Sequence, residues 1–418
     1  MTDQPGNSDF IPLILAADIN AYSWARAFHE QYGIVSAGLG RSLLGPVRDS
    51  RIIQFKAVDK LDQAEVLIGQ INSFAQRYPD QRILLVSCGD YYTSLVFSAR
   101  ESLAQNLVIT DMAADTLYRL TNKQQLCTLC EERGIDTPKS FIYQESFGGR
   151  LDLAFSAPYI VKPSDTLSWW ANPFNGQRKA HLASDKTALK NLISQVYAHG
   201  YAGSLLIQEY IEGADTQLYR LTLYLDSQGK LGLSHAGRIL LADHTALSEG
   251  NPAIQQSVDL ADPAQYMLAQ ATGQAFNLLF DLGYRGFASI SYKFDAQKQS
   301  LRLLGINAHP DRANYAITAS GLNIARMMAE DLLKGGLSQA DASYQEVLWH
   351  ITPLALVPSV VDAAGLSVSL ADLLRQGRTV DPLDYPADRG LARRFWLNRY
   401  HEYLRQKYQH LLQGGAHD

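Results

Sequence analysis

Residues 205–215 read LLIQEYIEGAD, an apolar run that predicts a buried strand and passes directly into an acidic turn with a glycine. A second apolar strand, 159–163, precedes it and is closed by proline. Between the two strands lie a loop rich in turn-forming and aromatic residues, 164–178, and a predicted helix, 184–199. The centre of the chain is therefore expected to alternate strands with helices.

The sequence after this turn predicts a hairpin and a second set of elements. Strands 218–225 and 231–240 flank a short glycine-containing turn, as expected for a hairpin. A long helix, 263–282, follows, and two further strands are expected at 288–294 and 300–306.

The first part of the chain alternates short apolar strands with amphipathic helices. Strands are expected at 10–16, 52–55 and 82–87, with helices at 21–32 and 64–78. This βαβ rhythm implies a small parallel sheet with helices on both faces.

Ligands of such sheets bind beyond the carboxyl ends of the strands, which here means the turns 17–20 and 88–90. Neither turn carries the G-x-G-x-x-G pattern, so a Rossmann dinucleotide site is not supported. Cys127 and Cys130 stand three residues apart inside a predicted helix with no second pair, and we interpret them as small core residues.

Composition excludes several classes of protein. Hydrophobic residues make up 46% of the 418 residues and charged residues 19%, which is typical of a globular chain. The net charge of −5 gives no basic excess, so no nucleic-acid partner is expected. Three cysteines are too few for a disulfide framework. No transmembrane segment is expected, and residues 1–9 do not resemble a signal peptide. We therefore expect a cytoplasmic protein.

Several motifs that are weak by themselves occur in a definite order. Lys123 opens a predicted helix, Lys162 closes the next strand, and Lys179 follows the flexible loop. The run 207–215 comes next, and two strands that end in Asn307 come last.

In this order the chain resembles the ATP-grasp superfamily, over residues 122–330. Over its whole length it is similar to one branch, the D-aspartate ligases of Gram-positive cell-wall synthesis. The stretches that carry the resemblance to the branch are Phe10-Ile-Pro-Leu-Ile-Leu, Ala27-Phe-His-Glu-x-Tyr-Gly33, Cys88-Gly89-Asp90, Gly321-Leu-Asn-x-Ala-Arg326 and Glu330-Asp331.

The resemblance implies an α/β fold, in part α+β, with four units. Residues 1–121 would form an N-terminal parallel-sheet domain and 122–212 the small lobe with its lid. Residues 213–335 would form the large lobe, and 336–418 an extension packed on that lobe.

The resemblance also implies an ATP site between the lobes. Lys123, Lys162 and Lys179 would neutralise the phosphates, and Asp215 would accept hydrogen bonds from the ribose. The hinge residues expected to read the adenine edge are Gln208, Glu209, Tyr210 and Ile211.

The reaction implied by the family is the ATP-dependent joining of a carboxylate to an amine. The carboxylate attacks the γ-phosphorus to give an acyl phosphate, which the amine then converts to an amide. Arg312 would hold the carboxylate or acyl phosphate bidentately, and the loop at Gly176 would close as a lid that excludes water. The expected partners are a small amino acid and an amine-bearing acceptor, with a peptidoglycan precursor as the acceptor suggested by the branch.

The expected magnesium site departs from the family pattern. The family uses an acid on the penultimate strand and Glu-x-Asn on the last, but this chain has Ser291, Gly305 and Asn307 at these positions. His309 stands where the branch has an arginine. Since Mg²⁺ in ATP sites is held through carboxylates and phosphate oxygens, the metal is in doubt. Asp311 and Asn307 are the remaining candidate ligands.

Three functions stay open on the sequence. The chain is a D-aspartate ligase-like enzyme, a catalytically impaired relative that binds nucleotide or a partner, or an ATP-grasp ligase for another acid. In the third case Trp169 and Trp170 would line an altered pocket, although packing of the lid explains them equally well. The basic, aromatic helix 391–412 is compatible with a membrane surface or with ordinary packing. Oligomeric state is not determined.

Overall fold

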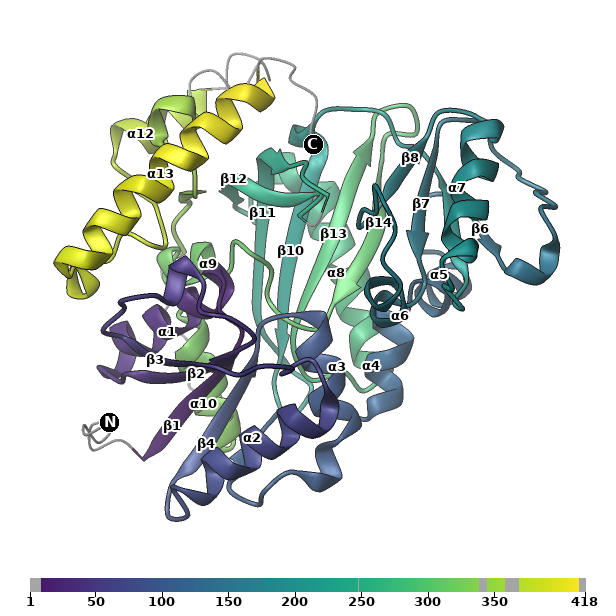
Figure 1. Ribbon diagram of the computed structural model, residues 1–418. Coiled ribbons are helices and arrows are strands. Elements are labelled where there is room, and N and C mark those ends of the chain that lie inside the picture. The colour runs from purple at the N-terminus through teal and green to yellow at the C-terminus, as the bar shows by residue number, and fades with distance from the viewer. Residues whose placement is uncertain (1–8, 247, 338–343, 358–367, 413–418) are drawn as a thin grey trace.

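The computed structural model describes residues 9–246, 248–337, 344–357 and 368–412. Three sheets of five, four and seven strands organise this part of the chain (Figure 1). The seven-stranded sheet stands in the centre of the view, with the four-stranded sheet to its right and the five-stranded sheet to its lower left (Figure 1). The sequence prediction of mixed α/β architecture is confirmed.

The five-stranded sheet is parallel throughout and carries helices on both faces, as expected. Its elements are β1 (Phe10–Leu15), α1 (Ile19–Tyr32), β2 (Ser36–Gly40), β3 (Ile53–Ala57), α2 (Ala64–Gln76), β4 (Arg82–Ser87), α3 (Asp90–Ser98) and β5 (Leu107–Val108). The strand order is β3-β2-β1-β4-β5. Val86 packs with Trp24 of α1, whereas Leu85, one residue earlier, packs with Leu67 of α2. Alternate side chains of β4 therefore meet opposite layers.

Strand β2 was not predicted, because its sequence SAGLG carries two glycines. The structure shows why they are needed. A Cβ on Gly38 would lie 2.8 Å from Ile53 and Phe55, and one on Gly40 would lie 2.7 Å from Phe55. The glycines therefore make room for the large side chains of β3.

The four-stranded sheet is antiparallel, with order β6-β9-β7-β8. This part of the chain comprises α4 (Ala114–Thr121), α5 (Lys123–Glu132), β6 (Ser140–Tyr143), β7 (Tyr159–Pro163), α6 (Thr166–Ala171), β8 (His181–Ala183), α7 (Lys186–Ala198) and β9 (Leu205–Glu209). Trp169 is 1% exposed and meets Phe174 edge to face at 5.3 Å, whereas Trp170 is exposed. Packing therefore accounts for Trp169, while Trp170 lies at the surface.

The seven-stranded sheet has the order β14-β13-β10-β11-β12-β15-β16 and is antiparallel except for its last pair. Its strands are β10 (Leu218–Leu225), β11 (Leu231–Asp243), β12 (Asn251–Val258), β13 (Gly286–Asp295), β14 (Ser300–Asn307), β15 (Leu348–His350) and β16 (Thr379–Val380). The helices of this region are α8 (Tyr266–Asp281), α9 (Tyr315–Ala319), α10 (Ile324–Lys334), α12 (Val368–Arg375) and α13 (Leu391–Leu412). Strand β12 was not predicted from the sequence.

Strand β10 has one apolar and one polar face near its start. Leu221 and Leu223 share a core with Leu278 of α8. Because strand side chains alternate, Arg220 and Thr222 point to the opposite face of the sheet. That face carries the candidate site.

The C-terminal residues join two parts of the molecule. Strands β15 and β16 extend the large sheet. Helix α13, however, also packs on the N-terminal unit, which we did not expect. Its Arg393 is fully buried in an ion pair with Asp388, 2.9 Å from Nε to Oδ2, and Asp388 accepts a hydrogen bond from Tyr22 of α1. In addition, Arg393 Nη1 donates to the Pro46 carbonyl.

Within the described ranges, every helix is too short or too polar to cross a bilayer.

We predict that Asp388→Ala lowers the free energy of unfolding by about 3–5 kcal/mol, because it leaves the buried Arg393 charge without its partner. Urea denaturation followed by circular dichroism measures this loss. Asp384→Ala is the matched control: it removes the exposed pair with Arg389, at 2.6 Å, and should cost about 1 kcal/mol or less. Equal losses in the two variants would contradict the role given to Asp388.

Candidate active site

The charges of the three predicted lysines act on one another, and Lys123 lines a slot between the small sheet and the large one. Lys123 begins α5, Lys162 lies in β7, and Lys179 follows the lid loop. The Lys162 ammonium donates to Gln208 Oε1 at 3.0 Å, and Gln208 Nε2 donates to Ser140 Oγ at 2.9 Å. Burial and the positive charges of Lys123 and Lys179 lower the pKa of Lys162 to about 8. Like charges held this close favour an anion.

An ion pair from the N-terminal unit forms another wall of the site. His309 Nε2 lies 3.1 Å from Asp90 Oδ1, and its Nδ1 lies 2.7 Å from the Pro310 carbonyl oxygen. Burial acts against a charged ring, yet these two acceptors raise the pKa of His309. Both ring nitrogens therefore face hydrogen-bond acceptors, an arrangement that favours the cationic form of the ring.

Asp90 connects this pair to the lysines. Desolvation acts to raise the pKa of Asp90, but the hydrogen bond and charge of His309 lower it overall. The charges of Lys179 and Lys123 act in the same direction. The turn 88–90 therefore faces the lysine cluster, which agrees with the expectation that this turn lies at a ligand site.

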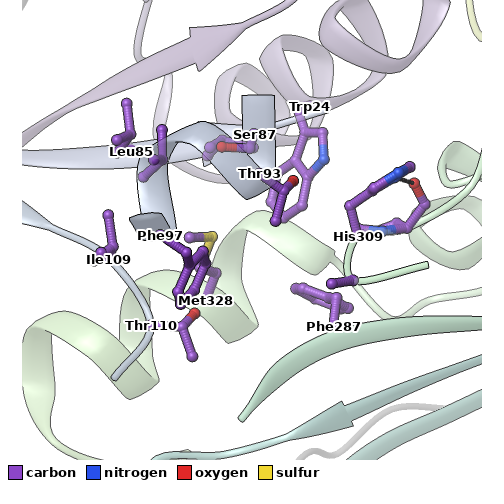
Figure 2. Close-up of a pocket in the computed structure, with 14 residues that line it drawn as sticks. Trp24, Leu85, Ser87, Thr93, Phe97, Ile109, Thr110, Phe287, His309 and Met328 are labelled. Carbon is purple, nitrogen blue, oxygen red and sulfur yellow. Dashed lines mark hydrogen bonds between the residues drawn. The ribbon is translucent and has the colours of Figure 1, made fainter. Parts of the chain in front are cut away.

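A pocket lies next to His309, between the N-terminal sheet and the large sheet (Figure 2). Ser87, at the carboxyl end of β4, and Thr93 of α3 line it together with the apolar rings of Trp24 and Phe287. Figure 2 shows these side chains around one space, with His309 at its edge. A small molecule with an apolar part and one anionic group suits this lining.

The side chain of Glu209, in the hinge, makes contacts that differ from those expected from the sequence. Its carboxylate accepts from the Lys139 backbone N–H at 2.9 Å and pairs with Lys298 at 3.2 Å. The Glu209 side chain therefore points to these partners, and the expectation that it reads adenine is not supported. Strand β9 ends at Glu209, so the backbone groups of Tyr210 and Ile211 lie beyond the strand. We retain them as the adenine-reading groups.

A narrow slot lies beside the hinge, between the small sheet and β14, an edge strand of the large sheet. Its lining is mainly apolar, which suits the faces of a purine ring. The residues of the slot are Lys123, Leu126, Cys127, Thr137, Leu206, Gln208, Leu303 and Leu304. Cys130 is buried, as expected of a core residue, whereas Cys127 lines the slot.

Asp215 takes part in a chain of hydrogen bonds that reaches the lid. Its Oδ2 accepts from the Ala242 N–H at 2.7 Å and lies 3.1 Å from His244 Nε2. Glu249 lies 3.0 Å from His244 Nδ1 and also pairs with Arg178 of the lid at 2.9 Å. The hydrogen bonds to Asp215 and Glu249 raise the pKa of His244 to about 10. The lid is thereby joined to the large lobe, with Asp215 held at its base.

Arg312 forms an ion pair that involves the end of the chain. Its Nη1 lies 3.2 Å from Asp243 Oδ2. The same oxygen accepts from Lys407 at 2.8 Å and from Tyr408 at 3.2 Å, both on α13. Thr245 occupies the other oxygen of Asp243. Asp243 thus fixes one edge of the Arg312 guanidinium, and the expected carboxylate-binding role remains a prediction for the other edge.

The positions at which the resemblance implies metal ligands lie side by side, but their residues do not fit a magnesium ion. Ser291 pairs with Gly305 across β13 and β14, and Ser289 pairs with Asn307. Neither Ser291 nor Gly305 supplies a carboxylate. Among the described residues, no cluster of three or more His, Cys, Asp or Glu side chains could hold a metal ion.

Asp311, the tentative substitute ligand, is engaged elsewhere. One oxygen accepts from the Ala313 N–H at 2.9 Å, and the other lies 3.4 Å from Nε of Arg220. The structure therefore places a cation where we expected Asp311 to face a metal. Asn307 keeps its position at the end of β14 but has no acidic neighbour across the strand pair.

Several residues of the site were not identified from the sequence. Arg220, Asp243 and His244 come from two separate segments, and only the fold brings them together. Arg220 had one usable signal. Arg220 is a basic residue in an otherwise largely apolar strand. The alternation of side chains along the predicted hairpin would place it on the polar face of the sheet.

The fold is shared with several solved structures of ligases and carboxylases. An L-amino acid ligase from Bacillus licheniformis matches with a TM-score of 0.56 and 13% identity, over 78% of this chain and 74% of that one. A biotin carboxylase complex from Campylobacter jejuni matches with a TM-score of 0.59 and 13% identity, over 82% and 76%. The biotin carboxylase domain of the Hydrogenobacter thermophilus 2-oxoglutarate carboxylase reaches 0.60 with 12% identity, over 82% and 74%. The chain therefore has the ATP-grasp fold.

One relative extends the likeness to the whole chain. The D-aspartate ligase of Enterococcus faecium (strain Aus0004) is 27% identical over 428 residues, covering 98% of this chain and 99% of the relative. No protein-family model matches the chain. The chain therefore resembles D-aspartate ligase along its whole length and shares its fold with an L-amino acid ligase, as expected from the sequence.

We predict that Lys162 titrates near pH 8 in the free protein and that nucleotide raises its pKa, because phosphate favours the charged form. Nucleotide affinity should then be full below pH 8 and fall as pH rises from 8 to the pKa of the complex. NMR of ¹³C-methylated lysines measures both values. Lys162→Arg, which removes the signal and keeps the charge, should flatten the pH dependence of binding. A Lys162 signal that titrates above pH 10 in the free protein would contradict this prediction.

Proposed function

We propose that this chain is an ATP-dependent ligase that joins the carboxylate of a small amino acid, D-aspartate, to an amine. The observation that carries the proposal is the cation cluster of Lys123, Lys162 and Lys179 at the junction of three sheets, in a chain similar to D-aspartate ligase along its whole length. Such a cluster suits the triphosphate of ATP. We assign the adenine to the apolar slot lined by Gln208 and Leu206.

The proposed reaction has two steps. A carboxylate oxygen attacks the γ-phosphorus, ADP leaves, and an acyl phosphate forms. The amine nitrogen then attacks the acyl carbon, phosphate leaves, and the nitrogen gives up a proton. Lys123, Lys162 and Lys179 hold the phosphates, and Arg312 together with His309 holds the acid or acyl phosphate. Loop 172–178 covers the site and excludes water from the intermediate.

The acceptor is the less determined of the two substrates. The likeness to a D-aspartate ligase supports a primary amine, such as the lysine side chain of a peptidoglycan precursor peptide. The pocket beside Ser87 and Thr93 opens between the N-terminal unit and the large lobe, next to His309. We assign it to one of the two substrates.

A second function is favoured by one specific observation, the absence of both family metal acids at Ser291 and Gly305. In this alternative the chain binds nucleotide or a partner and does not catalyse amide formation. Ser291→Asp combined with Gly305→Glu would then create a ligase activity that the native chain lacks.

We predict that the native protein releases ADP from ATP only when D-aspartate and an amine acceptor, such as a lysine-containing pentapeptide, are both present. A coupled ADP assay and mass spectrometry of the acceptor measure the reaction, with a mass gain equal to one aspartyl residue. Lys162→Met should reduce the rate at least a hundredfold, since it removes a phosphate-binding charge. Lys190→Met, on the exposed face of α7 in the same unit, is the matched control and should retain the native rate.

The absence of amide product in the native protein, together with its appearance in the Ser291→Asp/Gly305→Glu variant, would favour the second function. A product formed with other acids and not with D-aspartate would replace the substrate and keep the reaction.

A further inference from the structure

Three strands bring an arginine to the position of the missing metal ligands. Arg220 of β10 pairs in register with Ser291 of β13, and Ser291 pairs with Gly305 of β14. Directly paired residues of neighbouring strands point to the same face of a sheet. Arg220 therefore stands in one row with the two positions at which related enzymes carry acids.

The Arg220 guanidinium is held by partners on two sides, and the structure describes no partner for its remaining nitrogen, Nη1. Its Nε lies 3.4 Å from Asp311 Oδ2, and its Nη2 donates to the Gly250 carbonyl oxygen at 2.5 Å. Its side chain is only 12% exposed. The buried Nη1 has no hydrogen-bond partner among the residues that the structure describes. A buried donor without a partner is destabilising, and a ligand oxygen at this point would satisfy it.

The same face offers room and a second unsatisfied group. A Cβ built on Gly305 would meet no atom within 4 Å. Ser289 lies two residues before Ser291 on the same face of β13 and pairs with Asn307. Its side chain is 1% exposed, and its Oγ has no hydrogen-bond partner among the described residues. The row thus combines an open space with polar atoms that point toward it.

The charges around this row are suited to an anion. The positive charge of Arg220 acts on both Lys162 and Lys179, so the arginine belongs to the same cluster as the phosphate-binding lysines. Asp311 supplies the carboxylate that pairs with Arg220. A magnesium ion at this position would face the positive guanidinium of Arg220 and would lack two carboxylate ligands. The two positive charges would repel each other.

We propose that Arg220 takes the place of the metal, binding phosphate oxygens of the nucleotide directly, so that this chain binds ATP without a divalent cation. The inference rests on the ATP site of the proposed function. A guanidinium offers planar, paired donors to phosphate oxygens and keeps its charge at all physiological pH values. Asp311 and the Gly250 carbonyl position it, and Nη1 makes the contact.

Calorimetric titration of the full-length protein with ATP, once in excess EDTA and once in excess Mg²⁺, tests the proposal. We expect affinity in EDTA to equal or exceed that in Mg²⁺, because free ATP carries more negative charge than its magnesium complex. Arg220→Met should weaken binding in EDTA tenfold or more, and Arg220→Lys, which keeps a charge, less. Arg238→Met on β11 is the matched control, since its Nε donates to the Thr216 carbonyl away from this face. It should leave the affinity unchanged.

The outcomes separate the inference from the proposed function. Binding that tightens tenfold or more with Mg²⁺ in the native protein would overturn the role of Arg220 and leave the ATP site standing. This comparison needs no variant, so it holds even if Arg220→Met unfolds. Unchanged affinity of folded Arg220→Met in EDTA would also overturn it. No ATP binding in either buffer would overturn both the inference and the proposed function.

Discussion

Alternation of side chains along three neighbouring strands controls the candidate site. Residues 221 and 223 of β10 enter the core under α8, and this burial leaves positions 220 and 222 for the other face. The same rule applies to β13 and β14, whose pairing sets Ser291 against Gly305. A shift of one residue in any of these strands would send the site residues into the apolar core. Core packing therefore fixes the geometry of the polar face.

The site gathers cations at some cost to stability. Lys162 is held among other positive charges with its pKa lowered to about 8, which means that folding works against its charged state. Fixed cations of this kind are already positioned when an anion arrives, so no reorganisation is needed at that moment. On this view the unliganded fold stores electrostatic repulsion that nucleotide binding relieves. Nucleotide should accordingly stabilise the chain by mass action.

The sequence predicted the elements whose apolar runs were continuous. Tyr159–Pro163, Arg82–Ser87 and Leu218–Leu225 have the expected bounds. Strand β2 was missed because its glycines serve the side chains of β3, which local propensity does not register. The order of the lysines along the chain predicted that they belong to one site, and their charges act on one another; their phosphate-binding role stays a prediction. The partners of Glu209 and Asp311 could not be predicted, since Lys298 and Arg220 reach them only through the paired strands.

Helix α13 has a mechanical consequence for how substrates enter. It is anchored on the N-terminal unit by Arg393 and on strand β11 through Lys407. Because one helix clamps both, the N-terminal unit and the large sheet form a rigid frame. The small unit is held to that frame by partly exposed contacts such as Arg178 with Glu249, and these break more readily than the buried pair of Arg393 with Asp388. Under the proposed function, ATP would enter and ADP would leave through movement of the small unit against this frame.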